Sequence, residues 1–277
     1  MSGGVKNSIK QGEIKTMRLD FSEWISHLNT ANATSYESLH PSTWDALCPS
    51  IHAGFKTRLG SDSQNAEVYL YNPFGNLFTD SVDSVKFALK VIPVTVSHSL
   101  IRKELERSIK LSKHKFYPSV YAVGKCPIQT FHSSSRFKQA TEAYYIVFEL
   151  LWCDLQQFIR EHQPTVKKLK IIIKDVLKAI MNLNYDQKIF HNDLHLRNVM
   201  LRKTDTSFEV VLIDFGQSED FNEEDHLGLD VLEFLKMIKK ELGDNNKYAS
   251  IVKYVISVID KIEDANDVNE MIMIVSK

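Results

Sequence analysis

The amino-acid sequence predicts an α+β protein in which a small β-rich lobe precedes a helical lobe. From residue 51 to about residue 149, short runs of β-branched and aromatic residues alternate with turn residues. Beyond residue 150, the apolar residues recur with the helical period of 3.6. This change of period places the boundary between the lobes near residues 149–153. The β-rich lobe is expected to cover residues 51–149 and the helical lobe residues 150–277.

Residues 1–50 are expected to form a helical extension of the main domain. Within it, LDFSEWISHL has a helix-start signature, with Asp20 as N-cap and Glu23 three residues later. We expect this extension to dock on the main domain, and a dedicated partner-binding arm is the alternative.

The β-rich lobe is expected to contain an antiparallel meander and one helix. The runs GFKTRL, EVYLYN and VKFALKVI predict the first strands, because turn material separates them. Residues 100–111 predict a charged helix, and YAVGK and AYYIVFEL predict two further strands.

In the second lobe, the longest predicted helix covers residues 169–181, where apolar residues mark one face. KIF and EVVLID predict two short strands that flank a polar loop. LGLDVLEFLKMIKKEL predicts another helix, closed by Gly243, and one or two further helices are expected within residues 247–275.

Composition excludes several classes of protein. The ten glycines are about half the usual share, and no P-loop motif or intact G-x-G-x-x-G can be written, which excludes P-loop NTPases and the simplest dinucleotide-binding folds. Three widely spaced cysteines argue against a disulfide framework or a four-ligand zinc site, and for a reducing compartment.

The same sequence predicts a cytoplasmic or nuclear protein that is not secreted. Its first residues lack the apolar core of a signal peptide, and the longest apolar run, residues 143–153, is too short to cross a membrane. A net charge of -1 gives no direct indication of nucleic-acid binding.

Two motifs carry the chemistry: HNDLHLRN at residues 191–198 and IDFG at residues 213–216. In this order, and after a β-rich lobe, they resemble the catalytic loop and the metal-binding D-F-G of the protein-kinase-like superfamily. The resemblance implies a bilobal protein-kinase-like fold that uses ATP. It makes Asp193 the residue that orients the accepting hydroxyl and takes its proton. It also makes Asn198 and Asp214 ligands of Mg2+ or Mn2+, and Arg197 a residue that neutralises the transferring phosphate.

The first lobe carries matching features. Alternation in VKFALK places Ala88 and Lys90 on one face of a strand, which resembles the kinase strand whose lysine reaches the phosphates. In the helix that follows, Glu104 is the expected partner of Lys90, with Glu106 as the alternative.

The run YYIVFELLWCDLQQFI is similar to the hinge region of cyclin-dependent kinases. The similarity implies that Phe148 is the gatekeeper and that the backbones of Glu149 and Leu151 meet the adenine edge. Asp154 is expected to cap the next helix. The resemblance also implies contacts with the nucleotide by four more residues: Leu59, Gly60, Val68 and Met200.

The phosphate loop departs from the family pattern. In RLGSDSQNAEVYL, Asp62 and Ala66 replace glycines, which hinders close approach of the backbone to phosphate. We therefore expect weak or slow use of ATP.

The catalytic loop and the segment after D-F-G also depart from the pattern. Asn192 replaces the arginine that usually reads an activating phosphate, and His195 replaces a lysine. No A-P-E follows D-F-G. Asp230 resembles the aspartate that anchors the catalytic loop. The reduced second lobe resembles minimal kinases of the RIO and haspin type and compact kinases of large DNA viruses.

Charge is unevenly distributed. Residues 204–235 hold ten acidic residues and no Lys or Arg, whereas residues 102–115 hold six basic and two acidic residues. The acidic segment indicates either a solvated surface or attraction of a basic protein substrate.

The sequence therefore predicts an atypical ATP- and Mg2+-dependent Ser/Thr protein kinase. A small-molecule phosphotransferase and a nucleotide-binding pseudokinase scaffold are the alternatives.

Overall fold

The computed structural model describes residues 55–59, 66–71, 86–127, 140–222, 228–243, 245–264, 270 and 273. The predicted extension at residues 1–50, Gly60 and most of the phosphate loop lie outside these ranges. Contacts divide the chain into two units. The first comprises the described residues up to His98 and Ser119–Leu150, and the second comprises Ser99–Pro118 and the described residues from Leu151 onward.

The first unit is a five-stranded antiparallel sheet. Its strands lie in the order β1 (Phe55–Leu59), β2 (Glu67–Tyr71), β3 (Phe87–Pro93), β5 (Glu142–Glu149) and β4 (Val120–Pro127). The predicted meander is thus confirmed. Leu89, Val91 and Tyr145 belong to one buried apolar cluster on this sheet, so residues that alternate with them point to its other face.

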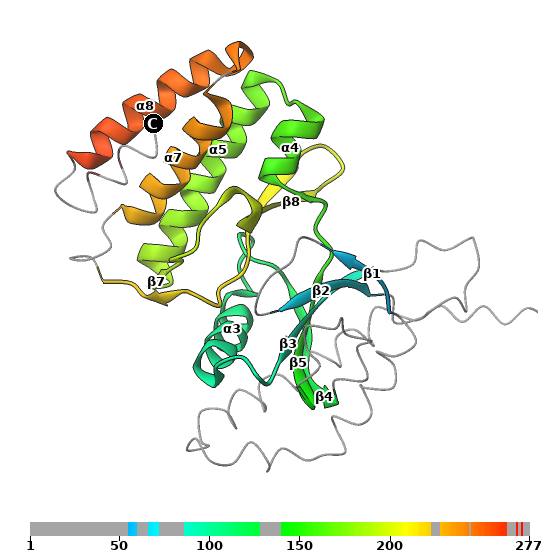
Figure 1. Cartoon of the computed structure of the whole chain (residues 1–277). Helices are drawn as coiled ribbons and strands as arrows, with labels where there is room; N and C mark the ends of the chain where they lie inside the picture. Colours follow the sequence, from blue (N-terminus) through cyan, green and yellow to red (C-terminus); the bar gives the residue numbers. More distant parts are fainter. Residues whose placement is uncertain are drawn as a thin grey trace, which may run out of the picture. The chain divides into compact units, whose positions relative to one another are not determined.

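The second unit is mainly helical and is built around one apolar core. It contains α3 (His98–Leu111) from Ser99 onward, α4 (Leu155–His162), α5 (Val166–Met181), α7 (Leu229–Leu242) and α8 (Ala249–Glu263). Helices α5, α7 and α8 lie side by side (Figure 1). The apolar face predicted for residues 169–181 is buried, and Asp154 caps α4 by accepting a hydrogen bond from the Gln157 amide. These findings confirm the predicted α+β class.

Short strands complete the second unit. β6 (Cys153–Asp154), β8 (Val199–Lys203) and β9 (Phe208–Leu212) form one sheet, and β7 (Ile189–Phe190) pairs with β10 (Glu219–Asp220). The sequence predicted only a polar loop between β7 and β9. This prediction was wrong, because β8 pairs with β9 along five residues. Within the described part of this unit, short helical turns also lie at Asn182–Asp186, Leu196–Asn198 and Asn246–Tyr248.

The cysteines differ from the sequence expectation. Cys153 is a free, buried thiol, but Cys126 in β4 is disulfide-bonded. This bond removes one argument for a reducing compartment, and the cytoplasmic or nuclear location stays a prediction. Among the helices that the structure describes, none has the length and apolarity needed to cross a bilayer.

Candidate active site

The loop between β7 and β8 is anchored by Asp230, which lies in the first turn of α7 and is fully buried. Its carboxylate accepts hydrogen bonds from the backbone amides of His191, at 2.8 Å, and Asn192, at 3.3 Å. It also accepts one from the Asn184 side chain at 2.8 Å. A buried carboxylate needs such donors to offset its lost hydration. The contacts confirm the expectation that Asp230 anchors this loop.

Two further residues fix the loop. The imidazole of His191 is fully buried, its Nε2 lies 3.0 Å from the carbonyl oxygen of Ile213, and its ring packs against Phe215. The Asn198 side chain donates through Nδ2 to the carbonyl oxygen of Asp193 at 2.9 Å. Asp193 itself is exposed, so its carboxylate is accessible on a loop whose backbone is held in place.

Asn198 and Asp214, the expected metal ligands, are joined through the backbone. The Ile213 amide donates to the carbonyl oxygen of Asn198 at 3.0 Å. Asp214 is the residue that follows Ile213, so the backbone next to it is bonded to Asn198. Because Asn198 uses Nδ2 for Asp193, its side-chain oxygen is the atom left for a cation. Asp214 has a φ of 67°, a left-handed conformation that costs about 1–3 kcal/mol outside glycine and is found at functional sites.

This oxygen donor set fits Mg2+. In phosphoryl-transfer sites, the ion takes one or two protein ligands together with the phosphates of the substrate. Among the described residues, no group of three or more His, Cys, Asp and Glu side chains could hold a metal ion. The pair of Asn198 and Asp214 is therefore suited to an ion that arrives with a nucleotide, and less suited to a permanently bound one.

His195, which departs from the family pattern, has a structural role. His195 precedes the short helical turn Leu196–Asn198, and its Nδ1 accepts a hydrogen bond from the Asn198 amide at 3.2 Å. It therefore stabilises the turn that positions Asn198. Arg197, in the same turn, is exposed.

Glu233 of α7 is a further acidic residue near Asp193 and Asp230. Burial raises the pKa of Glu233 in α7, and the nearby charges of Asp230 and Asp193 raise it further. The charges of His191 and Lys236 act in the opposite direction on Glu233, so both signs of charge lie near this carboxyl.

In the first unit, the predicted nucleotide-binding residues share one face of the sheet. Cross-strand pairing places Leu59 opposite Val68, Val68 opposite Lys90, and Ala88 opposite Phe148. Residues directly opposite one another point to the same face. All five are half-buried, whereas Leu89 and Val91 on the other face are fully buried. One face of the sheet thus carries the apolar side chains of this set together with the side chain of Lys90.

The remaining predicted nucleotide-binding residues that the structure describes belong to both units. The amide of Glu149 donates to the carbonyl oxygen of Ser119, and the Glu149 carboxylate accepts from the Ser119 amide, so the Glu149 amide is already bonded within the first unit. Leu151 and Met200 lie in the second unit, and both are half-buried.

The structure distinguishes the two candidate glutamates of α3. Glu104 is buried, and a Cβ atom added to Gly216 would lie 3.0 Å from its Oε2. Glu106 is at the surface and pairs with Arg102 at 2.7 Å. This arrangement favours Glu104, which lies beside the D-F-G glycine. Its pairing with Lys90 stays a prediction.

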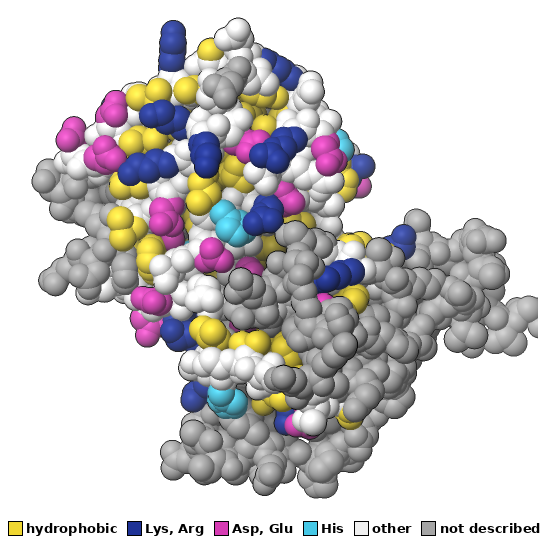
Figure 2. Space-filling view, viewed as in Figure 1, with side chains coloured by type: hydrophobic (Ala, Val, Ile, Leu, Met, Phe, Trp, Pro, Cys, Tyr) yellow, Lys and Arg dark blue, Asp and Glu magenta, His cyan; other side chains and the backbone are white. Residues whose placement is uncertain are grey.

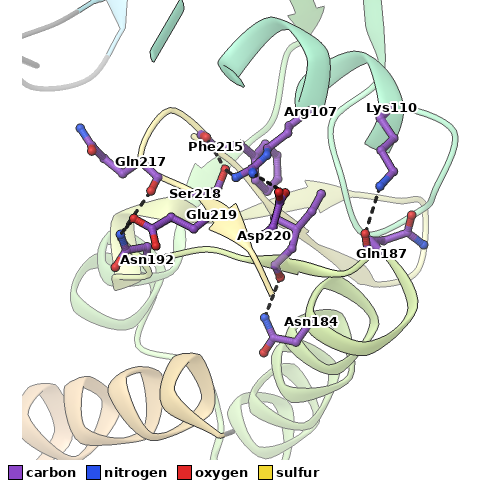
Figure 3. A network of polar contacts seen from close by, with 11 residues as sticks. Arg107, Lys110, Asn184, Gln187, Asn192, Phe215, Gln217, Ser218, Glu219 and Asp220 are labelled. Carbon is purple, nitrogen blue, oxygen red and sulfur yellow. Dashed lines mark hydrogen bonds and ion pairs between the residues drawn. The ribbon is translucent and has the colours of Figure 1, made fainter. Parts of the chain in front are cut away.

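Two residues near the site were not predicted from the sequence. Asn184 donates to both Asp230 and the Ile189 carbonyl oxygen. Arg107 of α3 donates to Ser218 and Asp220, which follow D-F-G (Figure 3). No local pattern identifies either residue, because their partners lie far away in the sequence.

Comparison with known proteins agrees with this geometry. Mitogen-activated protein kinase 4 of Arabidopsis thaliana is 26% identical to the chain over 184 residues, which cover 57% of the chain and 46% of that protein. Less than half of that relative's length is therefore matched. The family described as protein kinase domain matches residues 77–242, more than half of the chain. With its catalytic-type loop anchored by Asp230 and its D-F-G beside it, the chain belongs to the protein kinase domain family.

Proposed function

We propose that this chain is an ATP- and Mg2+-dependent protein kinase that transfers the γ-phosphate of ATP to Ser or Thr hydroxyls of a protein substrate. One observation carries the proposal: the loop with exposed Asp193 is fixed by Asp230, and Asn198 of the same loop is tied by its backbone to the segment of Asp214. Phosphoryl transfer depends mainly on such positioning and on neutralisation of charge.

Each residue has a defined role in the proposed reaction. Asp193 orients the substrate hydroxyl and accepts its proton. Asn198 and Asp214 would hold Mg2+, which neutralises charge on the phosphates when it is bound. Arg197 is exposed on the same turn, and it would stabilise the charge that develops on the transferred group.

The half-buried face of the first unit supports nucleotide binding. Val68, Ala88 and Phe148 would contact the adenine ring, and Lys90 would contact the phosphates, in pairing with Glu104 of α3. Leu59, Gly60, Leu151, Met200 and the backbone of Glu149 would complete the site. Since Asp62 and Ala66 replace glycines of the phosphate loop, we expect ATP to be used slowly.

A basic protein is the proposed substrate class. The acidic residues Glu223, Glu224 and Asp225 follow D-F-G in the sequence and would attract positive charge. On the face of the second unit seen in Figure 2, acidic side chains are interspersed with Lys and Arg, so the charge on this face is mixed. Reversal of the three acidic residues should lower kcat/KM for basic peptides and leave that for neutral peptides unchanged.

The test is phosphate transfer from labelled ATP to a mixture of proteins, with wild type, Asp193→Ala and Asp205→Ala compared. Asp205 is an exposed turn residue of the second unit, so its variant is the matched control. We expect label in protein Ser and Thr with wild type and control, and a loss of at least about 100-fold with Asp193→Ala.

Other outcomes would select an alternative function. Label that enters only small molecules would indicate a small-molecule phosphotransferase. Nucleotide binding without transfer under any Mg2+ or Mn2+ condition would indicate a pseudokinase scaffold. Full activity of Asp193→Ala would refute the proposed mechanism.

A further inference from the structure

A buried guanidinium connects α3 to the segment that follows D-F-G. The side chain of Arg107 is only 11% exposed, and its NH2 donates to Oδ1 of Asp220 at 3.0 Å. Its NH1 donates to the hydroxyl oxygen of Ser218. That hydroxyl, fully buried, donates in turn to the carbonyl oxygen of Phe215 at 2.5 Å. One side chain of α3 is thus linked to three residues of the segment (Figure 3).

A second set of contacts holds the same segment from the catalytic loop. The Asn192 side chain lies 3.3 Å from both the carbonyl oxygen of Gln217 and the carboxylate of Glu219. Pairing of β10 with β7 and the bond from the Phe221 amide to the Lys188 carbonyl oxygen extend this attachment. Residues 215–221 are therefore fixed on one side by α3 and on the other by the β7 region.

The positive charge of Arg107 in α3 is complementary to the negative charge of the segment that follows D-F-G. Burial lowers the pKa of Arg107, and the charges of Asp220, Glu106 and Glu219 act in the opposite direction. A buried guanidinium is retained only when anionic or polar acceptors meet its donors. Ser218 and Asp220 supply those acceptors, in a geometry of two adjacent oxygens that the planar group can contact at once.

We propose that Arg107 is a positioning residue that latches the segment after D-F-G to α3, with Ser218 and Asp220 providing the acceptors that an added phosphate group would otherwise supply. The catalytic loop and D-F-G are then held in their working arrangement without phosphorylation of this segment. The inference rests on the proposed kinase function for its catalytic consequence, but the latch itself is a property of the fold.

Asp220 is the best position for a test because its side chain is 99% exposed, so it can be replaced without altering the core. Asp220→Lys removes the acceptor and adds repulsion toward Arg107, whereas Asp220→Glu keeps the charge. Asp205→Lys makes the same change of charge at an exposed turn of the same unit and is the matched control.

The first measurement is hydrogen–deuterium exchange of residues 215–222, which needs no substrate. Hydrogen bonds to charged groups are strong enough that Asp220→Lys should speed exchange there by about tenfold, while Asp220→Glu and the control leave it unchanged. In an Arg107→Met background, Asp220→Lys should have no further effect, because the interaction is already lost. Unchanged exchange in Asp220→Lys would overturn the latch.

The second measurement is steady-state kinetics of phosphate transfer. A positioning role predicts that Asp220→Lys lowers kcat by about tenfold with little change in KM for the protein substrate, and that Asp220→Glu restores kcat. Wild type treated with a phosphatase should keep its full kcat. A loss of kcat on phosphatase treatment, or an unchanged kcat in Asp220→Lys, would refute the positioning role. If wild type transfers no phosphate at all, the proposed function fails, and the exchange measurement alone decides on the latch.

Discussion

Replacement of Asp230 by asparagine tests whether this carboxylate holds the catalytic loop. The carboxylate accepts three hydrogen bonds, two from backbone amides and one from Asn184. An asparagine keeps the size of the side chain but has one oxygen, so at least one donor faces an NH2 group. The change therefore removes the charge and one acceptor without opening a cavity.

The magnitude follows from these contacts. A hydrogen bond to a charged group contributes roughly 1.5–3 kcal/mol, a neutral one roughly 0.5–1.5 kcal/mol, and an unpaired buried donor costs roughly 1–3 kcal/mol. The lower desolvation free energy of the asparagine offsets part of this loss, because burial of a neutral amide costs less free energy than burial of a carboxylate. We expect Asp230→Asn to lower the local opening free energy at His191 and Asn192 by about 2 kcal/mol, which corresponds to roughly 30-fold faster amide exchange.

The assay is hydrogen–deuterium exchange of a peptide that covers residues 188–194, with Asp205→Asn as the exposed control. Phosphate transfer should fall in parallel, since Asp193 lies on the same loop. If exchange at His191 and Asn192 changes by less than about twofold, the carboxylate does not anchor the loop and the reasoning is wrong.

Three other predictions test the two units separately. Gly124→Ala should destabilise the first unit by about 1–3 kcal/mol in thermal unfolding, because a Cβ there would overlap the ring of Tyr145. Burial raises the pKa of Cys153 to about 11, so alkylation of this thiol at pH 8 should be at least about 100-fold slower than that of an ordinary cysteine. A hydrogen bond from Arg160 lowers the pKa of Glu241. This pair therefore stabilises the folded state above the unfolded-state pKa of Glu241, and its contribution is lost as the pH falls through the folded-state pKa. Denaturant titrations should show Glu241→Gln to be less stable than wild type at pH 7, with a difference that shrinks toward acidic pH.

Each of these predictions has a control and a contradicting result. Thr141→Ala, at an exposed position of the same unit, is the control for Gly124; equal melting temperatures for wild type and Gly124→Ala would contradict the overlap. Alkylation of Cys153 after denaturation is its own control, and equal rates before and after would contradict the burial. A difference for Glu241→Gln that does not depend on pH would contradict the ion pair.

Elements with a strong local pattern could be predicted from the sequence. The apolar spacing of residues 169–181 is a local property of α5, and the alternation in β3 follows from the period of two. β8 was missed because its five residues follow the catalytic loop directly, and it is a strand through pairing with β6 and β9. Strands of this length take their identity from partners that a local pattern does not contain.

Some residues of the candidate site could likewise be predicted from a local pattern, and others could not. Asp193, Asn198 and Asp214 lie in contiguous motifs, so their residue types and spacing could be recognised directly. Arg107 and Asn184 could not be assigned, because each acts through a partner distant in sequence: Ser218 and Asp220 for Arg107, and Asp230 for Asn184.

The acidic segment after D-F-G shows how such pairing changes the interpretation of charge. The number of acidic residues in this segment alone would indicate that all of its negative charge is available to attract a basic substrate. However, Asp220 is bonded to Arg107 and Glu219 lies beside the Asn192 amide, so part of this charge already serves contacts within the fold. Substituting these two residues would disturb the latch and substrate attraction together. Only reversal confined to Glu223, Glu224 and Asp225 separates the two effects: a fall in kcat/KM for basic peptides, without faster exchange at residues 215–221, would assign the remaining charge to the substrate.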